Sequence, residues 1–165
     1  MGMSIDNNMS SNGEKRQTYK NCITILWNDL YKAIDHYIKG NHNAQDIKYI
    51  TAYLGGCLFW IIAFYDIVLK VIAPQRYPET DEIKACKYAS NLVKHNEVII
   101  SHTYSDGGIS FPIGFPVEIN NIDILWKNGC LDVIHSDQKV AYNNKFADKS
   151  VKDTLQPIID LMLKA

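Results

Sequence analysis

The first strongly patterned segment runs from Tyr19 to Ile38, where hydrophobic residues recur every three or four positions. This spacing places them on one face of a helix, with polar residues on the opposite face. Gly40-Asn41 predicts the end of that helix, and Asn43 is a favourable N-cap for the next one. The hydrophobic face consists of Tyr19, Ile23, Leu26, Trp27, Leu30, Ile34, Tyr37 and Ile38.

The second segment, residues 43–73, is the most hydrophobic part of the chain and contains no charged residue from Tyr49 to Tyr65. A transmembrane helix needs about twenty apolar residues, whereas a core helix needs only neighbours that bury it. Lys48 and Asp66 bound the uncharged run closely, and Gly55-Gly56 dilutes it. We therefore expect a core helix that is buried on nearly all sides.

Two further helices are predicted by their N-caps and hydrophobic spacing. Thr80 or Asp81 caps the first, whose helical pattern fades near His95, and Ser150 caps the second, which runs to about Leu163. Pro157 lies inside the last helix and is expected to kink it or to mark its true start. The hydrophobic positions are Ile83, Cys86, Ala89, Leu92 and Val93 in the first of these helices and Val151, Leu155, Ile158, Ile159, Met162 and Leu163 in the second.

Between these two helices the hydrophobic period shortens to two, which predicts strands. A small antiparallel sheet is expected over about residues 98–135, with tight turns at Asp106-Gly107-Gly108 and Asn128-Gly129. Pro112 and Pro116 interrupt the return segment after the first turn, so that segment is expected at a sheet edge. The expected strands cover residues 98–104, 109–119, 122–126 and 130–135.

Together these elements predict a mainly helical α+β domain over residues 17–165, in which a helical bundle carries a small antiparallel sheet inserted before the C-terminal helix. Residues 1–16 are rich in Ser, Asn and Gly and lack a hydrophobic stretch, so a disordered tail is expected there. The same residues do not form a signal peptide. A cytoplasmic protein is therefore expected.

Composition narrows the function classes only a little. The 165 residues carry 17 Lys and Arg against 18 Asp and Glu, a net charge of −1. This balance argues against a strongly basic nucleic-acid binder but leaves local patches open. The four cysteines are far apart and lie in hydrophobic stretches, so we expect reduced core residues and neither a disulfide framework nor a metal site. They are Cys22, Cys57, Cys86 and Cys130.

The strongest chemical pattern lies on the third helix, where five polar residues fall within one stripe opposite the hydrophobic side. An imidazole beside amines and a carboxamide can act as a general acid or base on a phosphodiester, with the lysines stabilising negative charge. The same residues also suit a solvated basic face at the C-terminal end of a helix. The five are Lys84, Lys87, Asn91, Lys94 and His95.

The segment Lys-Tyr-Ala-Ser-Asn-Leu-Val-Lys-His at residues 87–95 resembles the active-site region of HEPN-domain proteins. That resemblance implies a small helical bundle, a homodimer with paired sites, and metal-independent ribonuclease activity of the toxin or abortive-infection type. The family motif is an Arg, a polar residue and then a His; Asn91 and His95 match the last two, and Ser90 occupies the place of the Arg. Because serine cannot supply the bidentate cation that would hold the scissile phosphate, a non-catalytic binding role is favoured.

Other polar and aromatic groupings are open to simpler interpretations. The pairs Asp35-His36 and Asp132/His135 have no spacing that joins them into a metal site. Four polar residues near the first predicted turn are more typical of a strand end and turn than of an acid–base cluster. They are His102, Tyr104, Ser105 and Asp106. The run 109–117 either folds back over the helical core or forms a partner surface, for which the candidate residues are Phe111, Pro112, Phe115 and Pro116.

From these observations we expect a HEPN-like helical protein that is a non-catalytic binding or interaction module in a bacterial or phage defence or counter-defence setting. One alternative is a metal-independent ribonuclease that uses His95 and Asn91, with Lys84, Lys87 and Lys94 contacting nucleic acid. Another is a small membrane-associated protein anchored by helix 43–73. The partners expected are a second copy, another protein or RNA, with no membrane and no cofactor.

Overall fold

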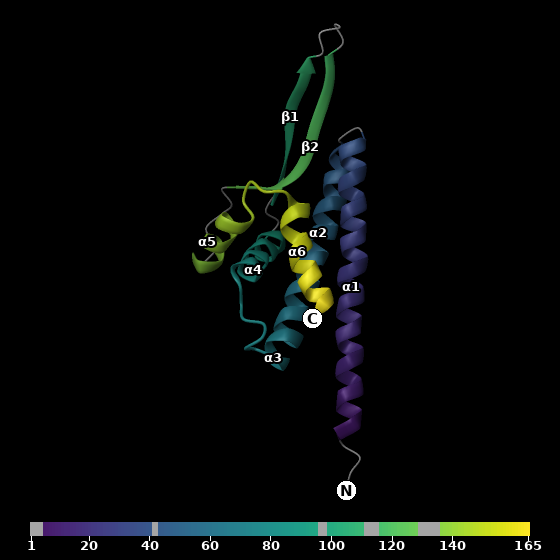
Figure 1. The fold of residues 1–165 in the computed structure, drawn as a ribbon, viewed down its shortest axis with the longest axis vertical. Helices are drawn as coiled ribbons and strands as arrows, with labels where there is room; N and C mark the ends of the chain where they lie inside the picture. The colour runs from purple at the N-terminus through teal and green to yellow at the C-terminus, as the bar shows by residue number, and fades with distance from the viewer. Residues whose placement is uncertain (1–4, 41–42, 96–98, 111–115, 129–135) are drawn as a thin grey trace.

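The computed structural model describes residues 5–40, 43–95, 99–110, 116–128 and 136–165, which form a helical body and a two-stranded arm (Figure 1). The mainly helical α+β class predicted from the sequence is confirmed. The elements are α1 (Ile5–Lys39), α2 (Ala44–Phe64), the π-helix η1 (Tyr65–Leu69), α3 (Lys70–Ile72), α4 (Asp81–Lys94), β1 (Ile100–Ser110), β2 (Pro116–Trp126), α5 (Ser136–Lys145) and α6 (Val151–Lys164).

The core of the body is built from the hydrophobic faces that the helical spacing predicts. α1 and α2 pack side by side, and Tyr19 stacks on Phe64 with ring centroids 5.9 Å apart. The α1–α2 connection begins at Gly40, where a Cβ atom would lie only 2.7 Å from the carbonyl oxygen of His36. Asn43, Thr80 and Ser150 cap α2, α4 and α6 as predicted, each accepting a hydrogen bond from the backbone N–H three residues later.

α2 contributes to this core, but the prediction that it is buried on nearly all sides is wrong. One face carries fully buried residues such as Leu54 and Ile61, packed among the other helices. The opposite face leaves Phe59 exposed, and Ile67 and Val71 continue that exposed face through η1 and α3. The sequence spacing could not separate these faces because hydrophobic residues occupy both of them.

The N-terminal segment also departs from its prediction, because α1 begins at Ile5 where a disordered tail was expected over residues 1–16. This segment contains Gly13 but no proline. Extending an existing helix by one residue costs much less free energy than nucleating a new one. The packed part of α1, from Tyr19 onward, supplies the nucleus to which these earlier residues add.

β1 and β2 form one long antiparallel hairpin, in place of the separate short strands that were predicted. Their pairing runs without interruption from Ile100 opposite Trp126 to Ser110 opposite Pro116. The predicted turn at Asp106-Gly107-Gly108 is therefore wrong, since Gly107 pairs with Ile119 inside the ladder. Gly129 of the second predicted turn and the strand at 130–135 lie outside the described residues.

The base of the hairpin is fixed to the helical body by Trp126. Its ring is fully buried, stacks on Phe146 at 4.6 Å between centroids, and its Nε1 donates a hydrogen bond to Thr154 Oγ1 at 2.6 Å. Leu125 forms a β-bridge with Ser150 at the start of α6. The rest of the hairpin extends away from the helices as an arm, which is visible at the top of Figure 1.

Candidate functional site

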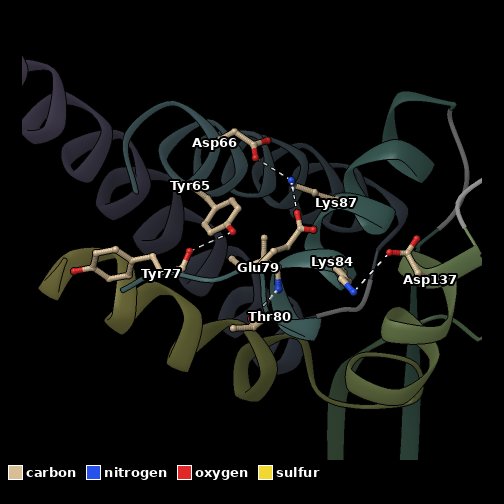
Figure 2. Close-up of polar contacts among 9 residues, drawn as sticks. Tyr65, Asp66, Tyr77, Glu79, Thr80, Lys84, Lys87 and Asp137 are labelled. Atoms are coloured by element: carbon tan, nitrogen blue, oxygen red, sulfur yellow. Dashed lines mark hydrogen bonds and ion pairs between the residues drawn. The ribbon is translucent and has the colours of Figure 1, made fainter. Parts of the chain in front are cut away.

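The polar face of α4 is the site that the sequence singles out, and the structure places it beside the π-helix and α5. Lys84, Lys87, Asn91 and Lys94 follow one another at helical spacing. The buried side of the same helix includes Ile83, Cys86, Ala89 and Leu92, as predicted. Figure 2 shows that the first two lysines reach toward carboxylates of neighbouring elements.

Lys87 is held between two carboxylates of its own chain. Its Nζ lies 2.8 Å from Asp66 Oδ1 and 2.6 Å from Glu79 Oε1, and 5.3 Å from the centroid of the Tyr65 ring (Figure 2). Only 17% of the side chain is exposed. Burial opposes the positive charge, but the hydrogen bonds to both carboxylates outweigh it and raise the pKa of Lys87 above its ordinary value of 10.5.

The same contacts attach the loop before α4 to the π-helix. Tyr65 donates a long hydrogen bond from its hydroxyl to the carbonyl oxygen of Tyr77, at 3.4 Å. Burial, together with the nearby Glu79 charge, raises the pKa of the Tyr65 hydroxyl. Because Asp66 belongs to η1 and Glu79 to the loop, Lys87 joins three segments that are separate in the sequence. Its contacts are those of a structural ion pair.

Lys84 also faces a carboxylate of the chain, here on α5. Its Nζ lies 3.6 Å from Asp137 Oδ2, and a second pair, Lys145 with Glu82 at 2.8 Å, joins the same two helices. The hydrogen bond from Lys145 lowers the pKa of Glu82. To contact a nucleic-acid phosphate, Lys84 would have to leave Asp137, just as Lys87 would have to leave its two carboxylates.

The remaining residues of the HEPN-like pattern lie at the C-terminal end of α4. His95 is the C-cap residue and is exposed, and Lys94 is exposed beside it. Asn91 is partly exposed, one turn before His95, so the two residues share this helix end. Ser90, at the position of the family's arginine, is 5% exposed and therefore turned away from them. In the described parts of the chain, no side chain forms a hydrogen bond or ion pair with the His95 imidazole.

The other candidate residues do not come together as a reaction centre. Asp35 binds Lys152 of α6, while His36 Nε2 lies 3.9 Å from Asp46 Oδ1. His102 is exposed near the base of β1, with its ring 6.0 Å from that of Tyr37. Residues 104–106 belong to the middle of β1 and not to a turn. Within the described ranges, no three His, Cys, Asp or Glu residues are grouped closely enough to hold a metal ion.

Several predicted residues lie outside the part of the chain that the structure describes. They are Asp132 and His135, Cys130, and the partner-surface residues Phe111, Pro112 and Phe115. Pro116 is the first residue of β2.

The three described cysteines are unpaired: Cys57 and Cys86 are buried as predicted, and Cys22 is partly exposed. Burial raises the pKa of the Cys57 thiol to about 12, which makes it a poor nucleophile.

Sequence reasoning missed two features of functional interest. The first is the pairing of Lys87 with Asp66 and Glu79, which helical spacing cannot reveal because the carboxylates belong to other segments. The second is the length of the arm, which was hidden because Gly107-Gly108 suggested a turn.

No protein-family model, no curated protein and no solved structure matches this chain. The resemblance of residues 87–95 to HEPN active sites therefore stays a prediction. Function has to be argued from the geometry of the molecule itself.

Proposed function

We propose that this chain is a non-catalytic interaction module that binds a protein partner through the β1–β2 arm. The observation that carries the proposal is the arm itself, in which β1 pairs with β2 over eleven residues each. Among the described residues, no third strand pairs with either of them, so beyond the base each strand has one edge whose backbone N–H and C=O groups lack a described strand beside them. Such edges accept an additional strand from a partner.

The anchored base of the arm supports this role. Trp126 and Ile124 are fully buried, and Ile100 and Ile122 at the same end are nearly so. A recognition element that is fixed at one end loses less conformational freedom on binding than a flexible loop does. The isolated two-stranded hairpin would be only marginally stable in water. The helical body therefore serves as the scaffold that presents it.

The geometry of α4 supports binding over catalysis. Lys87 is held by two carboxylates, so its charge is largely compensated before any phosphate approaches, and Lys84 has a weaker, solvent-exposed pair with Asp137. The buried Ser90 offers no cation in place of the family's arginine. Within the described ranges, no side chain forms a hydrogen bond with the exposed His95 imidazole, so none of them orients it as the partner of a general base usually does.

The ribonuclease is the second candidate, and the exposure of Lys94 and His95 at one helix end is the observation that favours it. It is tested by incubating the protein with labelled structured RNA in the presence of EDTA, alongside His95→Ala. The interaction module predicts no cleavage by either protein. Cleavage that disappears in His95→Ala would instead establish the ribonuclease.

The interaction role is tested by shortening the arm. In the variant, residues 106–120 are replaced by a two-residue Asn-Gly turn, which leaves the buried base and its pairs intact. Asn143→Arg on the exposed surface of α5 is the matched control. Both variants are compared with the original chain in quantitative affinity capture from extracts of the source cells, after circular dichroism has shown equal helix content. We expect a specific partner to be lost only from the shortened variant. Equal capture by all three proteins would refute the role of the arm.

A further inference from the structure

The end of the helical body at η1 and α3 exposes an unusual group of aliphatic side chains. Ile67 is 58% exposed, Val71 71% and Ile72 60%. Contiguous exposed apolar side chains on a protein surface mark sites of interaction. We call Ile67, Val71 and Ile72, which lie on successive turns of η1 and α3, the apolar tip.

An apolar hollow of about 300 Å³ lies between η1, the loop before α4 and the end of α6. Its walls include Leu69, Tyr77, Pro78 and Met162, together with Leu161, whose side chain is 46% exposed. Arg76 and Lys164 also line it, so a hollow with mainly apolar walls carries two cationic side chains. This combination suits a ligand with an apolar part and an anionic part.

Three exposed cations lie at the tip and the hollow: Lys70 on α3 itself, and Arg76 of the following loop and Lys164 of α6 at the hollow. Among the described residues, no carboxylate forms an ion pair with any of them. The nearby acidic side chains of Asp66 and Glu79 are bound to Lys87. Asp160 on α6 accepts a hydrogen bond from Gln156, and Asp81 at the start of α4 is exposed. This end of the body therefore combines exposed aliphatic side chains on η1 and α3 with three exposed cations that no described carboxylate pairs.

We propose that this end of the molecule attaches the protein to the surface of an anionic lipid membrane. Aliphatic side chains that enter the headgroup region, with lysine and arginine beside them, are the usual means by which peripheral proteins bind anionic lipids. By length and composition alone, the helix Ala44–Ile72 is also long and apolar enough to cross a membrane. Its packing against α1 and α4 favours attachment at the surface over spanning.

The position of the tip is compatible with the proposed role of the arm. In Figure 1, α3 lies on the side of the helical body opposite the hairpin, and the N-terminal part of α1 extends past it. A molecule attached to a membrane by α3 would leave the arm directed toward solution. The two proposals rest on different residues, so either can fail without the other.

Co-sedimentation with lipid vesicles tests the attachment. The complete chain is mixed with vesicles of phosphatidylcholine alone or of phosphatidylcholine containing phosphatidylserine. We expect binding to the anionic vesicles and much weaker binding to the neutral ones, with release at high salt. Removing one cation by Lys70→Gln or Arg76→Gln should weaken binding about fivefold. Lys48→Gln, which removes an exposed cation at the other end of the apolar helix, should leave binding unchanged.

The apolar contribution is tested with the double variant Val71→Asp/Ile72→Asp, which is expected to lose vesicle binding. Val140→Asp is the control because Val140, at 58%, is nearly as exposed as Ile72, at 60%, but lies on α5. The shortened-arm variant should bind vesicles like the original chain, which separates this proposal from the proposed function. Absence of binding to anionic vesicles would overturn the attachment. If the original chain binds no vesicles but self-associates, and the double variant no longer self-associates, the tip binds a second copy of the chain and the membrane proposal is wrong.

Discussion

The substitution Lys87→Met distinguishes two roles for this residue: a structural ion pair within the chain, or a lysine that binds phosphate. Removing the ammonium leaves Asp66 and Glu79 close together without their shared counter-charge. A buried hydrogen bond to a charged group contributes about 1.5–3 kcal/mol. The two carboxylate side chains are 40% and 34% exposed, so solvent screening reduces each contribution toward the low end of that range or below it. We therefore expect the free energy of unfolding to fall by about 1–2 kcal/mol.

Urea unfolding followed by circular dichroism measures this loss, and Lys84→Met is the control. The Lys84 pair is longer, at 3.6 Å, and the Asp137 side chain is 64% exposed. Its removal should cost less than about 0.5 kcal/mol. Adding Glu79→Gln to Lys87→Met should recover part of the stability, because one of the two uncompensated charges is then absent. Unchanged stability of Lys87→Met together with weakened RNA binding would refute the structural interpretation.

The raised pKa of Lys87 gives the same prediction a pH dependence. A group whose pKa is higher in the folded protein stabilises it fully below the unfolded value, here 10.5, and loses that effect as the pH rises through the folded value. The stability difference between the original chain and Lys87→Met should therefore persist at neutral pH. The same difference in the free energy of unfolding should shrink and disappear as the pH rises above 10.5.

The remaining predictions concern the core and the base of the arm. Trp126→Phe should lower the free energy of unfolding by about 1–2 kcal/mol, because the hydrogen bond to Thr154 and part of the buried ring are lost; a variant as stable as the original in urea would contradict this. Gly55→Ala should destabilise by about 1 kcal/mol despite the better helix propensity, because the new Cβ would lie 3.0 Å from Cγ1 of Val93; a raised melting temperature would show that the valine moves aside. With its pKa near 12, the Cys57 thiol should resist iodoacetamide at pH 8 and react only after unfolding, as peptide mass spectrometry can show; rapid native alkylation would disprove its burial.

The helices and their starts could be predicted because their causes are local. Asn43, Thr80 and Ser150 each satisfy a backbone N–H of the helix that follows, and a single sequence shows both the cap and the hydrophobic spacing behind it. The buried faces of α4 and α6 followed from the same spacing. These predictions needed no knowledge of distant neighbours.

The features that were missed depend on contacts between distant segments. Gly107 and Gly108 are compatible with a turn or with a strand, and only their pairing with Ile119 and Glu118 decides between the two. Which face of α2 is covered depends on where α1 and α4 pack, so the exposure of Phe59 is not encoded in local spacing. In the candidate site, the stripe of polar residues on α4 was visible, whereas the carboxylates that engage its lysines belong to other segments.

Site-specific photocrosslinking tests the central claim most directly. A photoreactive phenylalanine derivative is placed at Asn120, in the distal part of β2, and in a second protein at Asn143 on α5. After irradiation in extracts of the source cells, the account predicts a covalent adduct with one partner protein from position 120 and none from position 143. Adducts only from position 143, or none from the arm while the intact chain still captures a partner, would contradict it.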